Sequence, residues 1–158
     1  MANNKIEDKI NDFLCGIKQR DALDFVAFLR ANELLEESDD SGYAWGIKYA
    51  GGVIKIAETE KELWIWFSDV MFGTECSADD ELNHTIWDSV VICPQETCPS
   101  KRHCGCEGEV SGTVFGKAFE STCYFPLGFF SPDAKALENV KKLLLLFKEK
   151  RIIKQCTK

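Results

Sequence analysis

The sequence has few of the residues and runs on which several function classes depend. It holds only two histidines in 158 residues, so a histidine-based catalytic apparatus has little material. No GxSxG, HExxH or dinucleotide-binding fingerprint occurs in it. Its longest strongly apolar runs, residues 63–67 and 143–147, are far shorter than the roughly 20 residues that span a bilayer. The sequence therefore predicts no transmembrane segment and gives no support to these enzyme classes.

The chain also lacks targeting and linker signals. Charged residues recur through its first twenty positions and leave no apolar stretch for a signal peptide. We therefore expect a cytoplasmic protein with reduced thiols. There are only four prolines, and neither a repeat nor a Pro/Gly-rich linker divides the chain. Because a hydrophobic share of 45% is typical of globular proteins, we predict a single domain over residues 1–158.

Hydrophobic periodicity predicts an α+β fold, in which an antiparallel sheet packs with N-terminal helices and a C-terminal helix. An apolar stripe from Ile6 to Ile17 indicates the first helix, and Asp21 is expected to cap a second. Ser77 and Ser131 are expected to begin two later helices, because each hydroxyl is followed closely by acidic residues.

A β-hairpin is predicted around the two glycines at residues 51–52. If these glycines form the turn, Tyr49 lies opposite Ile54 and Ile47 lies opposite Ile56. The apolar residues of both strands then share one face of the sheet.

Three further strands are expected. Residues 63–67 carry large apolar groups at successive positions, which is typical of a central strand covered on both faces. Residues 112–119 and 122–130 are rich in β-branched and aromatic residues, and they predict two strands joined near residues 120–121.

Five of the eight cysteines fall within residues 93–123, a density typical of metal sites or disulfide scaffolds. In a reducing compartment such a cluster more often holds metal. Zinc takes four tetrahedral ligands, and a site filled by four thiolates leaves no position for water or substrate. We therefore expect a structural zinc ion held in a loop insertion. The candidate ligands are Cys93, Cys98, Cys104, Cys106 and Cys123.

The favoured four ligands include Cys106, with Cys104 as its substitute, because these two stand so close that one is expected to point away. His103 is an alternative nitrogen ligand. Disulfide bonds, redox-active thiols and an iron–sulfur cluster are the competing interpretations. Lys101, Arg102 and Lys117 are expected to offset the negative charge of the thiolates. The cysteines expected to be bystanders are Cys15, Cys76 and Cys156.

Charge is distributed unevenly along the chain. The net charge is −7, yet residues 132–158 carry eight Lys or Arg against three acidic residues. This basic C-terminal helix, with Lys101 and Arg102, supports an alternative function in nucleic-acid binding. The acidic remainder of the chain would repel a phosphate backbone, so a solvated helix surface is the simpler interpretation.

Aromatic residues suggest a ligand pocket near the predicted hairpin. A planar or apolar ligand would contact aromatic side chains there. The pocket residues are expected to be Trp45, Tyr49, Trp64 and Trp66. An enzyme that uses this pocket, either hydrolytic or thiol-dependent, is an alternative. We favour a non-enzymatic module with structural zinc that binds a small molecule or a protein.

Five motifs carry a resemblance over residues 43–151 to a group of small bacterial cysteine-cluster proteins with no assigned activity. They are the segment from Trp45 through the Gly-Gly hairpin, the approach from Trp87 to Cys93, the cysteines, Gly116-Lys117-x-Phe119 before Cys123, and Pro132-Asp133-Ala134 leading to Lys141-Lys142-Leu143. The resemblance implies an intracellular α+β domain with a metal site. This chain departs from the group in the spacing of its first cysteines and in the extra thiol of Cys104-Gly-Cys106.

Overall fold

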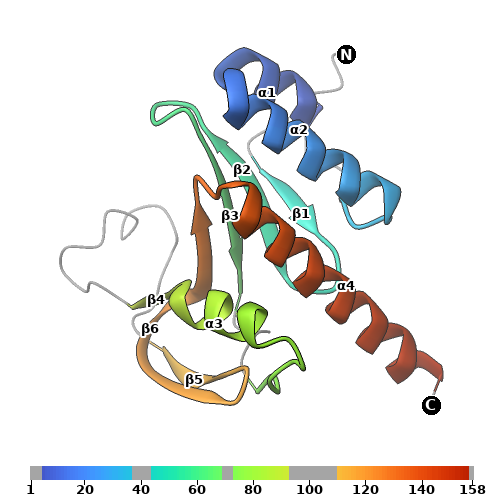
Figure 1. Cartoon of the computed structure of the whole chain (residues 1–158), viewed down its shortest axis with the longest axis vertical. Coiled ribbons are helices and arrows are strands. Elements are labelled where there is room, and N and C mark those ends of the chain that lie inside the picture. Colours follow the sequence, from blue (N-terminus) through green and yellow to red (C-terminus); the bar gives the residue numbers. More distant parts are fainter. Residues whose placement is uncertain (1–4, 37–43, 69–72, 93–109, 157–158) are drawn as a thin grey trace. The chain divides into compact units, whose positions relative to one another are not determined.

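The structure is a computed structural model that describes residues 5–36, 44–68, 73–92 and 110–156. Figure 1 shows its helices and strands, which confirm the predicted α+β class with an antiparallel sheet. The chain forms two compact units: unit 1 is Met1–Ile65 with Phe129–Lys158, and unit 2 is Trp66–Gly128. The expectation of a single domain stays a prediction. Within the described residues, no helix is long and apolar enough to cross a membrane.

Unit 1 begins with two helices whose boundaries differ from the predicted ones. They are α1 (Ile6–Phe13) and α2 (Gly16–Ala31). The backbones of Leu14 and Cys15 are extended, which ends α1 before the predicted stripe is complete. Ile17 is consequently 67% exposed on α2, and Asp21 lies inside this helix. The predictions that Ile17 belongs to the first helix and that Asp21 caps the second are therefore wrong.

Helix α2 ends in a Schellman motif that has no glycine. Glu33 takes the left-handed conformation with φ 56°, and the Leu34 N–H donates to the Leu29 carbonyl at 2.8 Å. Leu34 is buried, so an apolar contact accompanies this helix end.

The predicted hairpin exists, but its register is different. Strand β1 is Trp45–Ile47, β2 is Gly52–Ala57 and β3 is Glu62–Phe67. Trp45 pairs with Ile54 and Ile47 pairs with Gly52, so the loop is residues 48–51 and not the two glycines alone. Tyr49 lies in this loop with φ 72°. The predicted register is wrong by an even number of residues, which explains why the same apolar side chains still share one face.

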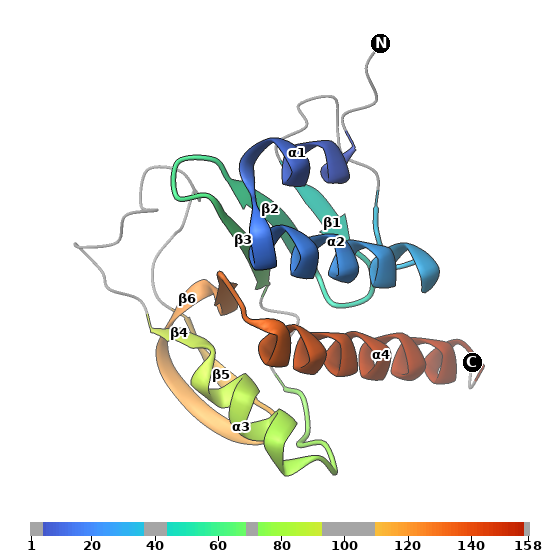
Figure 2. The ribbon, with the colours of Figure 1, turned by 45° about the horizontal axis from the view of Figure 1, so that its top comes forward.

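The core of unit 1 lies between this sheet and the helices. Helix α1 packs on β2, and α2 packs on both α1 and α4 (Ala134–Cys156). Figure 2 shows α2 between the other two helices. The largest fully buried side chains of this core are Trp45, Phe25, Ile6, Ile10, Leu29, Leu34, Ile54 and Ile65.

The cap of helix α4 lies two residues after the predicted one. The Oδ1 atom of Asp133 accepts a hydrogen bond of 2.8 Å from the Ala136 N–H, which is the geometry of an N-cap. Ser131 instead takes a left-handed conformation with φ 53°. The prediction that Ser131 caps this helix is therefore wrong, although the Ser-Pro-Asp sequence marked the correct turn.

In the part of unit 2 that the structure describes, one helix accompanies three strands that pair with one another. They are α3 (Asp80–Asp88), β4 (Val90–Ile92), β5 (Val110–Val114) and β6 (Lys117–Phe130), whose last two residues belong to unit 1. Strand β6 pairs antiparallel with β4 and with β5. The turn between β5 and β6 is at residues 115–116, so the predicted junction near residues 120–121 is wrong. That position carries a bulge instead, with Ser121 at φ 58°.

The cap of α3 is Asp79, and not Ser77. The Asp79 side chain accepts a hydrogen bond from the Leu82 N–H at 3.1 Å. Ser77 bonds the buried Asn83 side chain, through hydrogen bonds of 2.8 to 3.0 Å that satisfy the amide. Both residues precede the same helix, but the aspartate is in the capping position.

Candidate functional site

The described ends of the cysteine-rich segment meet at one residue of unit 2. Ile92, the last residue of β4, pairs with Thr122 of β6. Val110, the first residue of β5, also pairs with Thr122. Thr122 is buried, and its hydroxyl donates to the Val110 carbonyl at 2.9 Å. The chain therefore leaves β4 and returns to β5 beside the same position of the sheet.

Cys123 directly follows this position. Its side chain is partly buried, and because side chains alternate along a strand it points to the face opposite Thr122. The other candidate ligands, Cys93, Cys98, Cys104 and Cys106, lie outside the described residues, as does His103. Over residues 5–36, 44–68, 73–92 and 110–156, no three His, Cys, Asp or Glu side chains group as metal ligands. The structure thus places one candidate ligand, Cys123, beside both ends of the segment that carries the other four.

The tip of the β5–β6 hairpin is held by the preceding chain. Phe115 and Gly116 have φ values of 49° and 75°, as in a type I′ turn. Phe115 is 2% exposed, and its N–H donates to the Thr74 hydroxyl at 3.0 Å. The Cys76 thiol donates to the Phe115 carbonyl, and the Gly116 N–H donates to the Thr74 carbonyl at 2.9 Å. Cys76 is exposed, and its hydrogen bond to Phe115 helps to hold the hairpin tip.

Helix α3 is tied to the same hairpin through Trp87. The indole N–H donates to the Val114 carbonyl at 3.0 Å. The Lys117 ammonium lies 5.6 Å from the centre of the Trp87 ring and 5.4 Å from that of Phe119. These cation–π contacts fix the lysine against the sheet. His84, an exposed residue of α3, packs edge-on against the Trp87 ring at 5.2 Å.

The four residues of the expected aromatic pocket do not share one surface. Trp45 is 2% exposed and belongs to the core of unit 1, while Tyr49 lies in the β1–β2 loop. Trp64 and Trp66 alternate along β3 with buried Leu63, Ile65 and Phe67, so they point to the opposite face of that strand. The sequence showed the apolar alternation of the hairpin strands β1 and β2. It did not show which face of the sheet the helices cover.

A smaller aromatic surface lies on the side of β3 that Trp64 occupies, and we name it the Trp64 surface. The Trp64 ring packs edge-on against Phe130 at 5.5 Å, and the Lys55 ammonium lies 5.8 Å from its centre. Glu62 accepts a hydrogen bond from the indole N–H at 3.1 Å. Phe130 is 53% exposed. Sequence reasoning missed Lys55 and Phe130, although the alternation of β2 assigns Lys55 to this face.

Two lysines of the basic C-terminal helix are engaged within unit 1. Lys141 forms contacts of 2.8 Å with Asp24 and with Glu138, and Lys148 donates to the Asn32 carbonyl at 2.7 Å. Burial alone would lower the pKa of Lys141, but its hydrogen bonds to both carboxylates outweigh this effect and raise the pKa. These two cations therefore serve helix packing.

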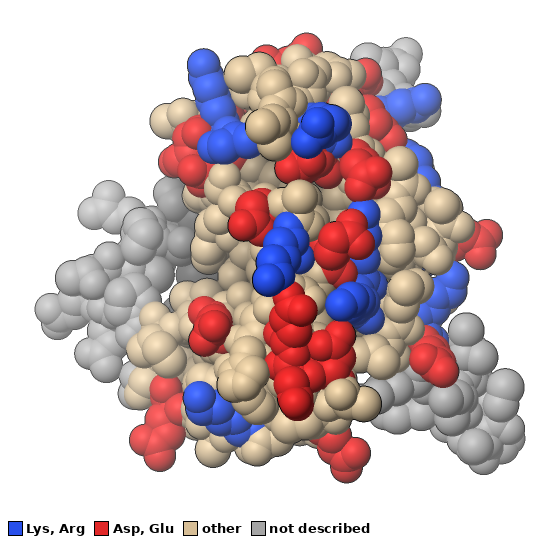
Figure 3. All heavy atoms as spheres, viewed as in Figure 1, with Lys and Arg blue, Asp and Glu red and all other residues tan. Residues whose placement is uncertain are grey.

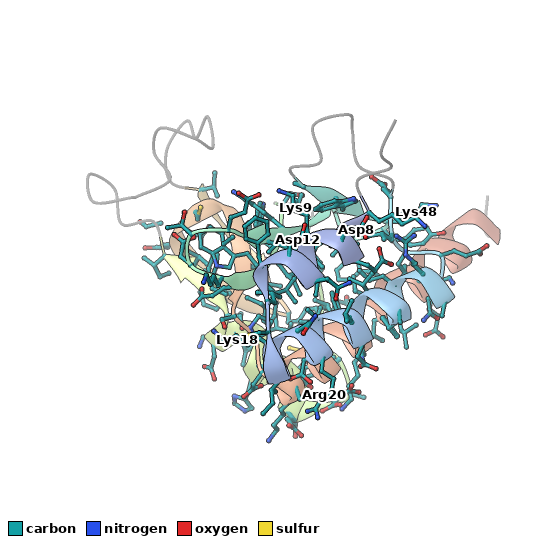
Figure 4. The ribbon with its side chains drawn as sticks, turned by 90° about the horizontal axis from the view of Figure 1, so that it is seen from above. Asp8, Lys9, Asp12, Lys18, Arg20 and Lys48 are labelled. Atoms are coloured by element: carbon teal, nitrogen blue, oxygen red, sulfur yellow. The ribbon has the colours of Figure 1, made fainter. Side chains whose placement is uncertain are left out.

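Charges of both signs lie on one face of the described structure. Figure 3 shows basic and acidic side chains interspersed on the face in view. Figure 4 shows Asp8, Lys9 and Asp12 along α1 beside Lys18 and Arg20 of α2. Such a mixture is typical of a solvated helix surface.

One shallow hollow is found in unit 1. It has a volume of about 220 Å³ that includes open solvent, and its enclosed part has room for about one water molecule. Its lining residues are Lys18, Asp21, Ala22, Leu63, Ser131, Pro132 and Leu137. The hollow is too small to hold a drug-sized ligand.

No protein-family model matches the chain, and no curated protein and no solved structure is significantly similar to it. The resemblance to the bacterial cysteine-cluster group therefore stays a prediction that rests on the quoted motifs.

Proposed function

We propose that this chain is a non-enzymatic binding module stabilised by one structural zinc ion. Cys123 of β6 provides one thiolate, and three of the four cysteines between Ile92 and Val110 provide the others. The observation that carries the proposal is that Ile92 and Val110 both pair with Thr122, the neighbour of Cys123. This pairing supports a closed site, because the segment that carries four of the candidate thiols begins and ends beside Thr122, the residue next to the fifth candidate, Cys123.

The chemistry of this ligand set favours a structural role for the metal. Four thiolates around a divalent ion fill its tetrahedral coordination sphere and leave no open position for water or substrate. The ion would connect the loop to the sheet of unit 2, where metal binding contributes directly to folding. The ammonium of Lys117 lies near the rings of Trp87 and Phe119, and its expected role in offsetting the thiolate charge stays a prediction.

Cobalt substitution tests the ligand set. Metal-free protein is titrated with Co²⁺ under reducing conditions, and the thiolate-to-cobalt charge-transfer absorption is recorded. We expect a tetrahedral spectrum at one equivalent for the native chain and a weaker charge-transfer band for Cys123→Ser. Cys15→Ser, which removes an exposed thiol of unit 1, is the matched control and should leave the spectrum unchanged. Equal spectra for Cys123→Ser and the native chain would exclude Cys123 as a ligand.

The binding role is assigned to the Trp64 surface. The exposed ring of Phe130 packs beside Trp64, and the two rings offer apolar area to a planar ligand, with the charged groups of Lys55 and Glu62 both in contact with the tryptophan. Lys55 belongs to the Trp64 surface because its ammonium lies over the Trp64 ring.

An anilinonaphthalene sulfonate probe, which is planar, apolar and anionic, tests this surface. Its fluorescence should rise with the native chain and fall with Phe130→Ala. Ile17→Ala is the control, since Ile17 is a similarly exposed apolar residue of unit 1 outside the Trp64 surface. An equal loss in both variants would indicate nonspecific adsorption and would remove the Trp64 surface from the proposal.

A further inference from the structure

The Trp64 surface has its charges and its second ring in different directions from the tryptophan. In the sheet, β3 lies between β2 and β6. Lys55 of β2 and Phe130 of β6 therefore lie on opposite sides of Trp64, across the strands. Glu62 lies two residues before Trp64 on the same face of β3, along the strand. All four residues belong to unit 1, so the surface is defined within one unit.

The apolar part of this surface faces away from the helices of unit 1. Helix α1 packs on β2, and Leu63 and Ile65, which alternate with Trp64, are buried on the opposite face of β3. Phe130 is 53% exposed, and Val53, on the same face of β2 as Lys55, is half-buried. An exposed phenyl ring that packs on a half-buried indole is typical of the centre of a protein interface, where aromatic residues are enriched.

Both charged groups can take a further partner while they keep their contact with Trp64. The indole N–H of Trp64 bonds one oxygen of Glu62, and a carboxylate has two. The ammonium of Lys55 lies over the indole ring, and an ammonium has three N–H donors. The matching partner surface therefore has aromatic rings at its centre, with one acidic and one basic side chain beside them. The Trp64 surface itself has this composition.

We infer that the Trp64 surface binds a second copy of this chain in a two-fold symmetric dimer. The Trp64 rings meet at the centre, and Lys55 of each protomer pairs with Glu62 of its partner. The inference rests on the binding role proposed for this surface and names its partner, and it does not involve the zinc site.

The arrangement of the charges agrees with this symmetry. In a two-fold interface, if one residue contacts a second across the interface, the second also contacts the first. Lys55 lies across the strands from Trp64, and Glu62 lies along the strand. A two-fold axis in the plane of the interface, halfway between these two directions, places each lysine over the partner's glutamate. The strands of the two protomers then cross at about a right angle, which is one of the two common ways in which sheets pack face to face.

Sedimentation velocity of the full chain under reducing conditions tests the dimer. We expect the native chain to change from monomer to dimer as its concentration rises. Phe130→Ala should raise the concentration of this change about tenfold or more, because truncation of a central aromatic residue is costly. Ile17→Ala, at a similarly exposed apolar residue of α2, should leave it unchanged. Circular dichroism confirms that each variant is folded. A native chain that stays monomeric up to about 1 mM would overturn the inference.

Charge reversal tests the pairing across the interface. Lys55→Glu and Glu62→Lys should each weaken the dimer, because each variant places like charges opposite one another. A mixture of these two variants should form a heterodimer, since every pair across its interface is again a lysine with a glutamate. Lys18→Glu and Asp12→Lys are the matched controls, because they reverse exposed charges of α2 and α1 (Figure 4), and neither variant nor their mixture should change the dimer.

The outcomes separate this inference from the binding role on which it rests. A dimer that none of the variants at Phe130, Lys55 and Glu62 weakens would show that another face forms it, and the inference would be wrong. Weakening by both charge variants without recovery in their mixture would also contradict the stated pairing. If the native chain is monomeric but its Trp64 surface still binds the fluorescent probe, the binding role stands and the dimer is wrong. If neither is observed, both fail.

Discussion

The backbone N–H of Ser131 donates a hydrogen bond of 2.8 Å to the carbonyl of Leu63. Through this contact the chain returns to unit 1 beside the strand from which it departed, after 63 residues of unit 2. The cysteine-rich segment repeats this arrangement on a smaller scale, since Ile92 and Val110 both pair with Thr122. The chain thus carries a segment inserted into a unit that is itself inserted.

The Asp133 cap of α4 predicts a measurable loss of stability. Asp133→Ala removes the side-chain acceptor of the Ala136 N–H and should lower the free energy of unfolding by about 1 kcal/mol. Urea denaturation followed by circular dichroism measures the change. Ser131→Gly is the control, because φ 53° suits glycine and its N–H still bonds Leu63. A larger loss in the control would mean that Ser131, and not Asp133, fixes this helix start.

The end of α2 predicts a stabilising substitution. Glu33→Gly relieves the left-handed strain at φ 56° and should raise the free energy of unfolding by about 0.5–1 kcal/mol, less the added freedom of glycine in the unfolded chain. The same denaturation measurement applies. Ala27→Gly, at an exposed position inside α2, should instead destabilise by about 1 kcal/mol. Destabilisation by both variants would contradict the Schellman assignment.

The hairpin tip predicts a steric effect at Gly116. A Cβ atom there would lie 3.1 Å from the Cys76 sulfur, at φ 75°. Gly116→Ala should therefore destabilise unit 2 by about 1–2 kcal/mol, followed through the indole N–H resonance of Trp87. Gly16→Ala, at φ 61° with open space around it, gives the backbone cost alone. Cys76→Ala added to Gly116→Ala should recover part of the loss, and no recovery would refute the predicted contact.

The ion pair between α1 and α2 predicts a pH dependence. The hydrogen bond from Arg30 holds the pKa of Glu7 below its ordinary value of 4.5. Glu7 is thus a group with a lowered folded-state pKa, and its stabilisation is present above pH 4.5 and is lost as pH falls through the folded-state pKa.

The test compares the native chain with Glu7→Gln. At neutral pH the variant should be about 0.5 kcal/mol less stable, the modest size expected for a surface pair. This difference in the free energy of unfolding should shrink toward zero in strong acid. Glu60→Gln, in the exposed turn before β3, should show no such convergence. A difference that stays constant with pH would show that Glu7 acts by packing and not by charge.

Element types followed from the sequence, whereas element boundaries depended on local geometry. The shared apolar face of β1 and β2 was predicted because alternation survives an even change of register. The positions of two turns were not, because Tyr49 and Phe115 take left-handed conformations that these residue types rarely adopt. Tertiary contacts hold such residues in place, as Thr74 and Cys76 do at Phe115.

The candidate site shows the same division. Clustering of thiols was visible in the sequence, but the role of Thr122 was not, because pairing between distant strands has no local signal. The placement of the expected pocket residues was not visible for a related reason. The sequence around Trp45 fits a half-buried strand and that around Trp64 a strand covered on both faces, and only the packing of helices on the sheet decides which of the two is covered.

Zinc content of the purified full chain is the decisive measurement for the proposed zinc site. Protein prepared under reducing conditions without added metal is analysed by inductively coupled plasma mass spectrometry. We expect about one zinc ion per chain, lost in Cys123→Ser and kept in Cys15→Ser. A stably folded native chain that contains no metal would contradict it.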